Sequence, residues 1–168
     1  MFKVAILTAS DAGSRGERED RSSLVIRELI PPIGEVVDYA LVPDEREAIS
    51  EVLARWADQG IADLIMTTGG TGFSPRDITP EATLDIVERA VPGIPEALRA
   101  MSYKKTPRAM LSRGTAGIRK QTLIINMPGS PIACREYMEF LLPVLEHGLE
   151  ILTGRGGNCA RPDKGQEK

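Results

Sequence analysis

Short runs of apolar residues that do not alternate with polar ones recur along this sequence. Phe2–Thr8, Ala62–Thr67 and Leu123–Asn126 have this pattern, and each contains β-branched residues. Because a strand that is buried on both faces carries apolar residues in succession, these runs are typical of a parallel sheet. Glu35–Val42 predicts a further strand.

The segments between these runs carry helical signals. Helices are expected from about Ser22 to Ile30, from Asp44 to about Ala57, from Thr79 to about Ala90, over Pro95–Tyr103, and along a final apolar face from Tyr137 to Leu152. Pro31-Pro32 ends the first helix and Gly60 caps the second. Ala12–Arg21 has glycines and charges without periodicity, which predicts a mobile loop. Strands alternating with helices predict an α/β fold of three layers, αβα, with a mostly parallel sheet and a ligand crevice at its carboxyl edge.

Length and composition limit the class of protein. The 168 residues fit one domain, expected over 1–153, with a flexible C-terminal tail over 154–168. A net charge of −3 and 4% aromatic residues argue against nucleic-acid binding. Cys134 and Cys159 form no disulfide framework, and no apolar stretch has membrane-spanning length. We therefore expect a cytoplasmic protein that binds neither nucleic acid nor membrane.

Two segments, Met66–Pro80 and Ile125–Pro131, share one design. Each is a buried strand followed by a glycine-containing turn and a helix that begins with Ser-Pro or Thr-Pro. Glycines let backbone amides approach an anion, and the helix N-terminus favours negative charge. Together with Ser10-Asp11 at another strand end, the two segments predict a phosphate site. The alternative is that the glycines only end strands.

Acidic residues follow the same strand ends. Asp77 comes after the glycine turn and suits Mg²⁺ held against a polyphosphate, although it would also serve as a helix-capping acid. Asp11, Asp20 and Asp44 are expected on the same edge. Asp44, three residues before Glu47, also fits a capping box.

Rival chemistries find little support in the sequence. The single histidine, His147, falls on the final helix, far from the glycine turns, which disfavours a Ser-His-Asp triad. Cys134, Cys159 and His147 form no spaced cluster for zinc.

Longer blocks of the sequence resemble one family. Thr67–Gly72 followed by Pro75–Thr83 closely resembles the signature of molybdopterin adenylyltransferases, the MogA-type proteins and the gephyrin G domain. The other blocks that resemble the family occur in the same order: Ser10-Asp11, Val42–Glu45, Leu111–Arg113, Ala116–Arg119 and Asn126–Pro131. The resemblance covers about residues 2–153.

The resemblance implies a MoaB/Mog-like fold, usually a homotrimer, that uses Mg²⁺ and ATP to adenylylate the terminal phosphate of molybdopterin. Hand-over of the product to a molybdenum insertase would follow. By motif match, Asp77 and Asp44 correspond to the acids that serve magnesium and catalysis. The residues expected to bind pterin or nucleotide are Ser10, Asp11, Asp20, Thr68, Gly69, Gly70, Thr71, Gly72, Thr79, Ser112, Arg113, Asn126, Pro128, Gly129 and Ser130.

One position departs from the family pattern. Many relatives carry a lysine where this chain has Ile132, so Arg113 or Arg135 is expected to replace that cation. Either Asp11 or Asp20 is expected to accept hydrogen bonds from the amino-pyrimidinone edge of the pterin. The chemistry needs no protein nucleophile, since the substrate phosphate itself attacks. A non-catalytic module that binds or carries molybdopterin is the alternative function.

Overall fold

The computed structural model describes residues 1–156. Its elements, in chain order, are β1 (Phe2–Ala9), α1 (Asp11–Ser14), α2 (Arg21–Leu29), β2 (Gly34–Val42), α3 (Arg46–Asp58), β3 (Leu64–Thr68), α4 (Thr79–Leu84), β4 (Arg89–Ala90), α5 (Gly93–Tyr103), the 3-10 helix η1 (Pro107–Leu111), β5 (Ala116–Arg119), β6 (Thr122–Met127) and α6 (Pro131–Thr153). The strands form one sheet in the order β2-β1-β3-β6-β5-β4. The four strands β2, β1, β3 and β6 run parallel, and β5 and β4 are antiparallel additions at one edge. The predicted α/β class with a mostly parallel sheet is confirmed.

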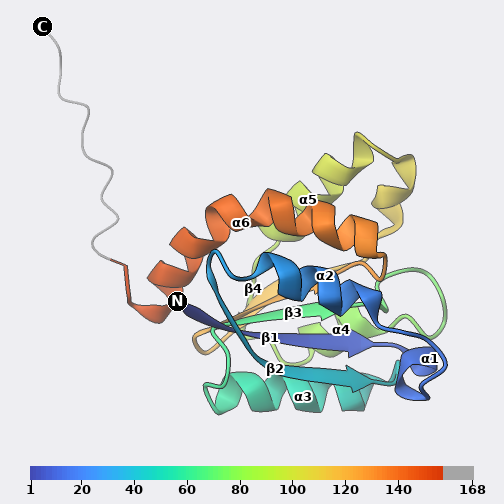
Figure 1. The fold of residues 1–168 in the computed structure, drawn as a ribbon, viewed down its shortest axis with the longest axis horizontal. Helices are drawn as coiled ribbons and strands as arrows, with labels where there is room; N and C mark the ends of the chain where they lie inside the picture. The colour runs from blue at the N-terminus through green and yellow to red at the C-terminus, as the bar shows by residue number, and fades with distance from the viewer. Residues whose placement is uncertain (157–168) are drawn as a thin grey trace, which may run out of the picture.

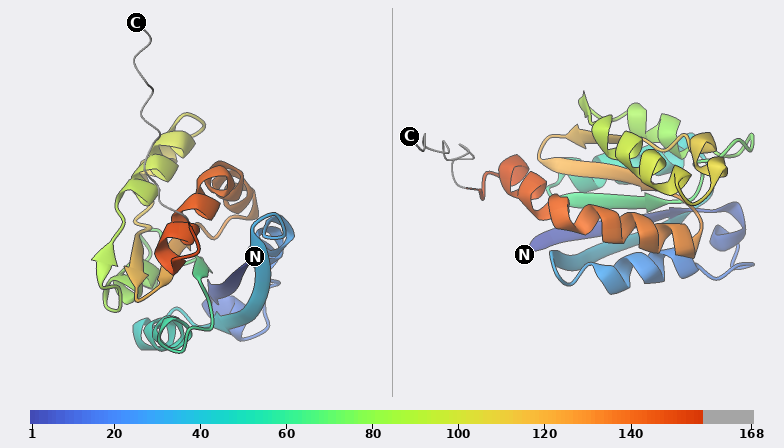
Figure 2. Two further views of the ribbon diagram at one scale, coloured as in Figure 1. Left: turned by 90° about the vertical axis from the view of Figure 1, so that its left-hand side faces the viewer. Right: turned by 90° about the horizontal axis from the view of Figure 1, so that it is seen from above.

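Helices cover both faces of the sheet (Figure 1 and Figure 2). On one face α2, α5 and α6 pack on the sheet through a core that includes Ile26, Leu98 and Met138. On the other face α3 and α4 pack through a second core that includes Trp56 and Ala82. The apolar runs supply both cores because successive side chains of a strand point to opposite faces. The sheet is therefore enclosed, and its carboxyl edge is left to form a site.

Several sequence expectations about local structure were wrong. The segment expected as a mobile loop contains α1, whose first turn is capped by Ser10: the Ser10 Oγ accepts from the Gly13 amide at 3.0 Å. The helix expected to reach Ala90 ends at Leu84, because the Glu88 amide donates to the Ile118 carbonyl and the chain then pairs with β5 as β4.

Two expected helix caps also differ. Ile78, not Thr79, is the N-cap of α4, and Thr79 is its first residue. Glu45, not Asp44, is the N-cap of α3, and its side chain makes no capping bond. The Asp44 side chain bonds across to another strand end, which competes with the capping geometry.

The end of the described chain packs against its beginning. Arg155 donates to the Met1 carbonyl and to Asp63, each at 3.2 Å, and its guanidinium lies 5.2 Å from the Phe2 ring centroid. Arg155, in the first part of the expected tail, thus contacts the start of the chain. The remainder, 157–168 with Cys159, lies outside the described residues. Among residues 1–156, no helix combines the length and apolar character that crossing a bilayer requires.

Candidate functional site

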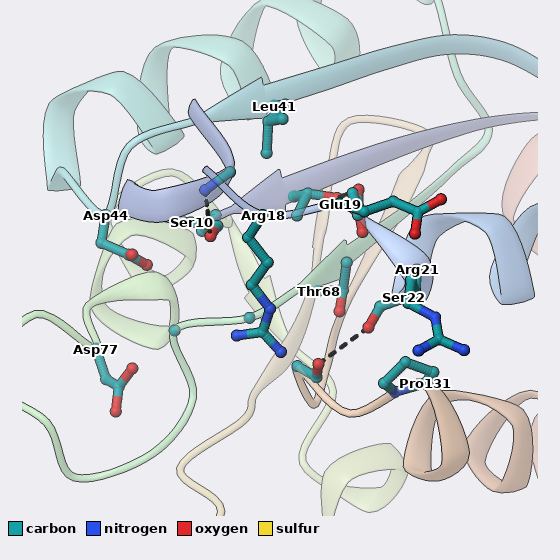
Figure 3. A pocket seen from close by; sticks show the side chains of 17 residues that line it. Ser10, Arg18, Glu19, Arg21, Ser22, Leu41, Asp44, Thr68, Asp77 and Pro131 are labelled. Carbon is teal, nitrogen blue, oxygen red and sulfur yellow. Dashed lines mark hydrogen bonds between the residues drawn. The ribbon is translucent and has the colours of Figure 1, made fainter. Parts of the chain in front are cut away.

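A cavity of about 360 Å³ opens at the carboxyl edge of the parallel strands. Its lining comes from the ends of β1, β2 and β3, the segment before α2, and the turn before α6 (Figure 3). The residues that line it are Thr8, Ala9, Ser10, Gly13, Arg18, Glu19, Asp20, Arg21, Ser22, Leu41, Asp44, Thr68, Gly69, Gly70, Asp77, Gly129 and Pro131. The position is the one at which ligands bind in open α/β sheets.

The two glycine turns lie against each other, and both contribute to the lining of this cavity. Gly69 has φ +90°, and a Cβ on it would overlap the Ala9 carbonyl oxygen. A Cβ on Gly129 would lie 3.4 Å from the Gly69 Cα. Gly70 has φ +63°, and a Cβ there would overlap the Thr79 Oγ1. Gly69 and Gly70 are therefore required by their backbone conformation and close neighbours, before any ligand is considered, whereas a Cβ on Gly129 would make only an ordinary contact.

Asp44 is fixed at the cavity by Asp11. The Asp11 amide donates to Asp44 Oδ2 at 2.9 Å, and the Asp44 amide donates to Asp11 Oδ1 at 3.0 Å. Arg76 grips both Asp11 carboxylate oxygens at 2.8 and 2.9 Å, and this bond holds the pKa of Asp11 at about 2. Burial, together with the negative charges of Asp11 and Asp77, raises the pKa of Asp44. A cation beside Asp44 would remove that penalty.

Asp77 reaches the cavity from the loop between β3 and α4. Its Oδ2 accepts from the Ser74 amide at 2.8 Å. Arg113 fastens the loop: its Nε donates to the Gly72 carbonyl at 2.7 Å, its Nη2 donates to the Asp77 carbonyl at 2.5 Å, and its Nη1 pairs with Glu81. Because Arg113 bonds on both sides of the turn, it fixes the loop that presents the Asp77 carboxylate.

Asp20 lines the cavity and is also the N-cap of α2. Its carboxylate accepts from Thr8 Oγ1 at 2.5 Å, from Tyr39 Oη at 2.7 Å and from the Ser23 amide at 3.0 Å. Burial opposes ionisation here, but these hydrogen bonds outweigh it and lower the pKa of Asp20. The group therefore stays an acceptor at neutral pH.

The structure brings together only part of the expected site. The expected residues on the cavity are Ser10, Asp20, Asp44, Thr68, Gly69, Gly70, Asp77 and Gly129. The expected residues that do not line it are Asp11, Thr71, Gly72, Thr79, Ser112, Arg113, Asn126, Pro128 and Ser130.

Several of the expected residues that do not line the cavity instead form hydrogen bonds that hold neighbouring segments in place. Asn126 is buried, and its Nδ2 donates to Thr67 Oγ1 at 3.0 Å and to Thr83 Oγ1 at 2.9 Å. Pro128 gives its carbonyl to Thr68 Oγ1 at 2.7 Å. Ser130 caps α6 through the Ala133 amide.

The two arginines expected to replace the lysine that many relatives carry at position 132 do not line the cavity either. Arg113 is committed to the Asp77 loop, and Arg135 pairs with Glu28 at 2.8 Å. Ile132 itself is 74% exposed and does not line the cavity.

Sequence reasoning missed the segment just before α2. Arg18 and Glu19 in this segment, and Arg21 and Ser22 in the first turn of α2, line the cavity, and Ser22 Oγ donates to the Gly129 carbonyl at 2.9 Å. The missed signal was the N-cap pattern of Asp20 before Ser22-Ser23, which fixes the end of the charged segment. The other lining residues not expected were Thr8, Ala9, Gly13, Leu41 and Pro131.

The acidic residues on the cavity fit a magnesium ion that also binds substrate phosphates better than a metal ion held by protein side chains alone. Residues 1–156 contain no group of three or more side chains of the metal-binding types His, Cys, Asp and Glu arranged to hold an ion. Two carboxylates, Asp44 and Asp77, do line the cavity. One or two carboxylates completed by substrate phosphates is the arrangement that Mg²⁺ prefers in phosphate-binding sites.

Comparison with known proteins gives a consistent result. A family model described as "Probable molybdopterin binding domain" matches residues 5–147. A molybdopterin adenylyltransferase of Helicobacter pylori (strain J99) is 41% identical over 156 residues, which is 90% of this chain and 88% of that protein.

Solved structures agree with the family match. The molybdopterin biosynthesis enzyme MoaB of Thermus thermophilus superimposes with a TM-score of 0.87 at 54% identity, covering 92% of this chain and 98% of that one. The tungsten cofactor synthesizing protein MoaB of Pyrococcus furiosus gives a TM-score of 0.82 at 36% identity, over 90% and 97% of the two chains.

Proposed function

Because the chain belongs to the family described as the probable molybdopterin binding domain, we propose that it is a molybdopterin adenylyltransferase. In this reaction an oxygen of the terminal phosphate of molybdopterin attacks the α-phosphorus of ATP. The bond from that phosphorus to the bridging oxygen breaks, and pyrophosphate leaves with the electron pair. The product is adenylylated molybdopterin, formed during molybdenum cofactor biosynthesis.

The observation that carries the proposal is the cavity itself. It combines two acids, Asp44 and Asp77, with the Gly69-Gly70 turn, with Gly129 in the turn before α6 and with Pro131 as the first residue of α6. Acids that suit a magnesium ion and backbone that suits phosphate lie in one space, as transfer between two phosphate groups requires. Residues 1–156 place no histidine on this lining, and the reaction needs none because the nucleophile belongs to the substrate.

The residues of the chain act mainly by positioning. The Gly69-Gly70 turn and the N-termini of α2 and α6 line the cavity. In the proposed reaction they bind the phosphates and orient the two reacting groups. Asp44 and Asp77 would hold Mg²⁺, which when bound offsets the negative charge of the phosphates. Asp20 lines the cavity and Asp11 does not, which favours Asp20 as the acceptor for the pterin edge.

The test is pyrophosphate release from ATP, Mg²⁺ and molybdopterin. The wild-type protein should release pyrophosphate, and Asp77→Asn should lower the rate at least about tenfold, because the amide keeps the shape but not the charge. The melting temperature of this variant should stay close to that of the wild type. Binding of molybdopterin without turnover by the wild type would instead favour the non-catalytic carrier.

Finer properties belong to the same proposal. We place the reaction in the cytoplasm, with Mg²⁺ and ATP as required partners and a molybdenum insertase as recipient of the product. We also propose a homotrimer. Support for an oligomer comes from the outer face of α6, where Ile132, Phe140, Val144 and Ile151 are between 43% and 74% exposed.

A further inference from the structure

The charged residues on the cavity are mostly acidic. Glu19, Asp20, Asp44 and Asp77 line it, and Arg18 and Arg21 are the cations on the lining as the structure describes it. A phosphate or polyphosphate entering this space would meet several carboxylates. Binding of such an anion therefore needs cations within reach, besides any metal ion.

Arg18 is placed to supply one. Its side chain extends into the cavity, between the side where Asp44 and Asp77 lie and the side where Ser22 and Pro131 lie (Figure 3). Within residues 1–156, its guanidinium makes no hydrogen bond or ion pair, so all of its donors are available.

The neighbouring arginines that do not line the cavity are already engaged in ion pairs. Arg15 pairs with Glu17 at 2.9 Å, Arg76 with Asp11 at 2.8 Å, and Arg113 with Glu81. Arg135 pairs with Glu28 at 2.8 Å. None of these four side chains lines the cavity. Of the two arginines that do, Arg21 lies on the side of Ser22 and Pro131, whereas Arg18 projects between the two sides.

The backbone that carries Arg18 is held at both ends. Before it, the Gly16 amide donates to the Gly13 carbonyl at 2.8 Å and the Glu17 amide donates to the Ala12 carbonyl at 2.9 Å. After it, Asp20 is fixed by Thr8 and Ser23. The side chain therefore starts from a defined turn rather than a free loop.

From this geometry we propose that Arg18 is a substrate-binding residue that grips a phosphate group in the cavity. Its planar fork of donors matches two phosphate oxygens. The inference rests on the proposed function for the identity of the phosphate, which belongs either to ATP or to molybdopterin. The binding of phosphate by Arg18 can be tested apart from that function.

The first experiment titrates tripolyphosphate with Mg²⁺ into the wild-type protein and into Arg18→Gln, Arg18→Lys and Arg15→Gln. Arg18→Gln should weaken binding about tenfold or more, and Arg18→Lys should fall between it and the wild type. Arg15→Gln is the matched control, since Arg15 lies in the same segment but pairs with Glu17 and does not line the cavity. Melting curves check that each variant is folded.

Steady-state kinetics then separate the two sources of phosphate. A higher KM for ATP alone would place Arg18 on the nucleotide, and a higher KM for molybdopterin alone would place it on the pterin phosphate. The proposal is overturned if wild type does not bind tripolyphosphate, if Arg18→Gln binds it within about twofold of wild type, or if Arg15→Gln loses as much affinity. Absence of turnover in the wild type would contradict the proposed function and leave the titration to decide the role of Arg18.

Discussion

Asp11 and Asp44 hold each other through a reciprocal pair of hydrogen bonds, in which each backbone amide donates to the other residue's carboxylate at 2.9 and 3.0 Å. The pair joins the end of β1 to the end of β2. Arg76 neutralises Asp11, whereas Asp44 stays partly buried at the cavity with a raised pKa. The fold thus maintains a disfavoured charge at the place where the proposed chemistry needs one.

Asp44→Asn should therefore make the protein more stable and less active. A raised pKa means that the ionised carboxylate is less favourable in the folded than in the unfolded chain, so removing the charge stabilises the fold at neutral pH. The melting temperature, measured in buffer with a chelator, should rise by a few degrees. Pyrophosphate release should fall at least about tenfold. A lower melting temperature would mean that the bond from the Asp11 amide outweighs the burial of charge.

Arg113→Lys should lower turnover although Arg113 does not line the cavity. A lysine cannot donate at once to the Gly72 carbonyl, the Asp77 carbonyl and Glu81, so the loop that presents Asp77 would loosen. We expect kcat to fall about tenfold with a smaller change in the KM for ATP. Arg108→Lys is the matched control, because Arg108 is exposed on η1 and its side chain makes no hydrogen bond within residues 1–156. Equal kinetics for the two variants would remove Arg113 from loop positioning.

Thr79→Val should be tolerated or stabilising. Thr79 is fully buried, and its Oγ1 has no hydrogen-bond partner among the described residues, so valine removes an unpaired hydroxyl at nearly constant shape. Thr83→Val is the contrasting variant: Thr83 Oγ1 donates to the Thr79 carbonyl and accepts from Asn126, both at 2.9 Å. Its loss should cost about 1–2 kcal/mol. Denaturant unfolding measures both variants, and a clear destabilisation by Thr79→Val would show that its hydroxyl has a partner.

Asp58 should link stability to pH far from the cavity. Hydrogen bonds from Arg119 and an ion pair with Lys120 lower the pKa of Asp58 to about 2. A lowered pKa contributes stability above the ordinary value of 3.8, and that contribution is lost as the pH falls towards about 2. The wild type should thus melt at a higher temperature than Asp58→Asn at neutral pH, and the difference should shrink below pH 4. A difference that stays constant down to about pH 2.5 would contradict this assignment.

The proposed trimer has a direct test in sedimentation equilibrium at micromolar concentration. The measured mass should be about three times the chain mass of 18.3 kDa. Replacing Phe140 and Val144 with serine on the outer face of α6 should weaken the assembly, because both side chains are exposed in the single chain. A mass of one chain would exclude an oligomer, and a mass of two chains would exclude the trimer but not the proposed reaction.

Local patterns in the sequence were enough for the strands and for the edge on which the site lies. Apolar runs without alternation marked β1, β3 and β6, and the glycine turns after β3 and β6, with Ser10-Asp11 after β1, marked the carboxyl edge. The antiparallel pair of β4 and β5 was not predicted, because β4 has only two residues and depends on hydrogen bonds to a distant segment. The N-caps expected at Thr79 and Asp44 were wrong for the same reason. Both residues match the local capping pattern, but contacts with distant segments decide where the two helices begin.

By itself the sequence determined the class of the fold, the family, and the presence of acids and glycines near one edge of a sheet. Only the tertiary structure decided which of these face the cavity. The Asp77 side chain lines the cavity, whereas Arg113 bonds to the loop that carries Asp77. Arg18 extends into the cavity from a segment that has no periodic pattern. The reason is physical: residue type and spacing fix local backbone shape, but the direction of a charged side chain depends on partners brought together across the chain.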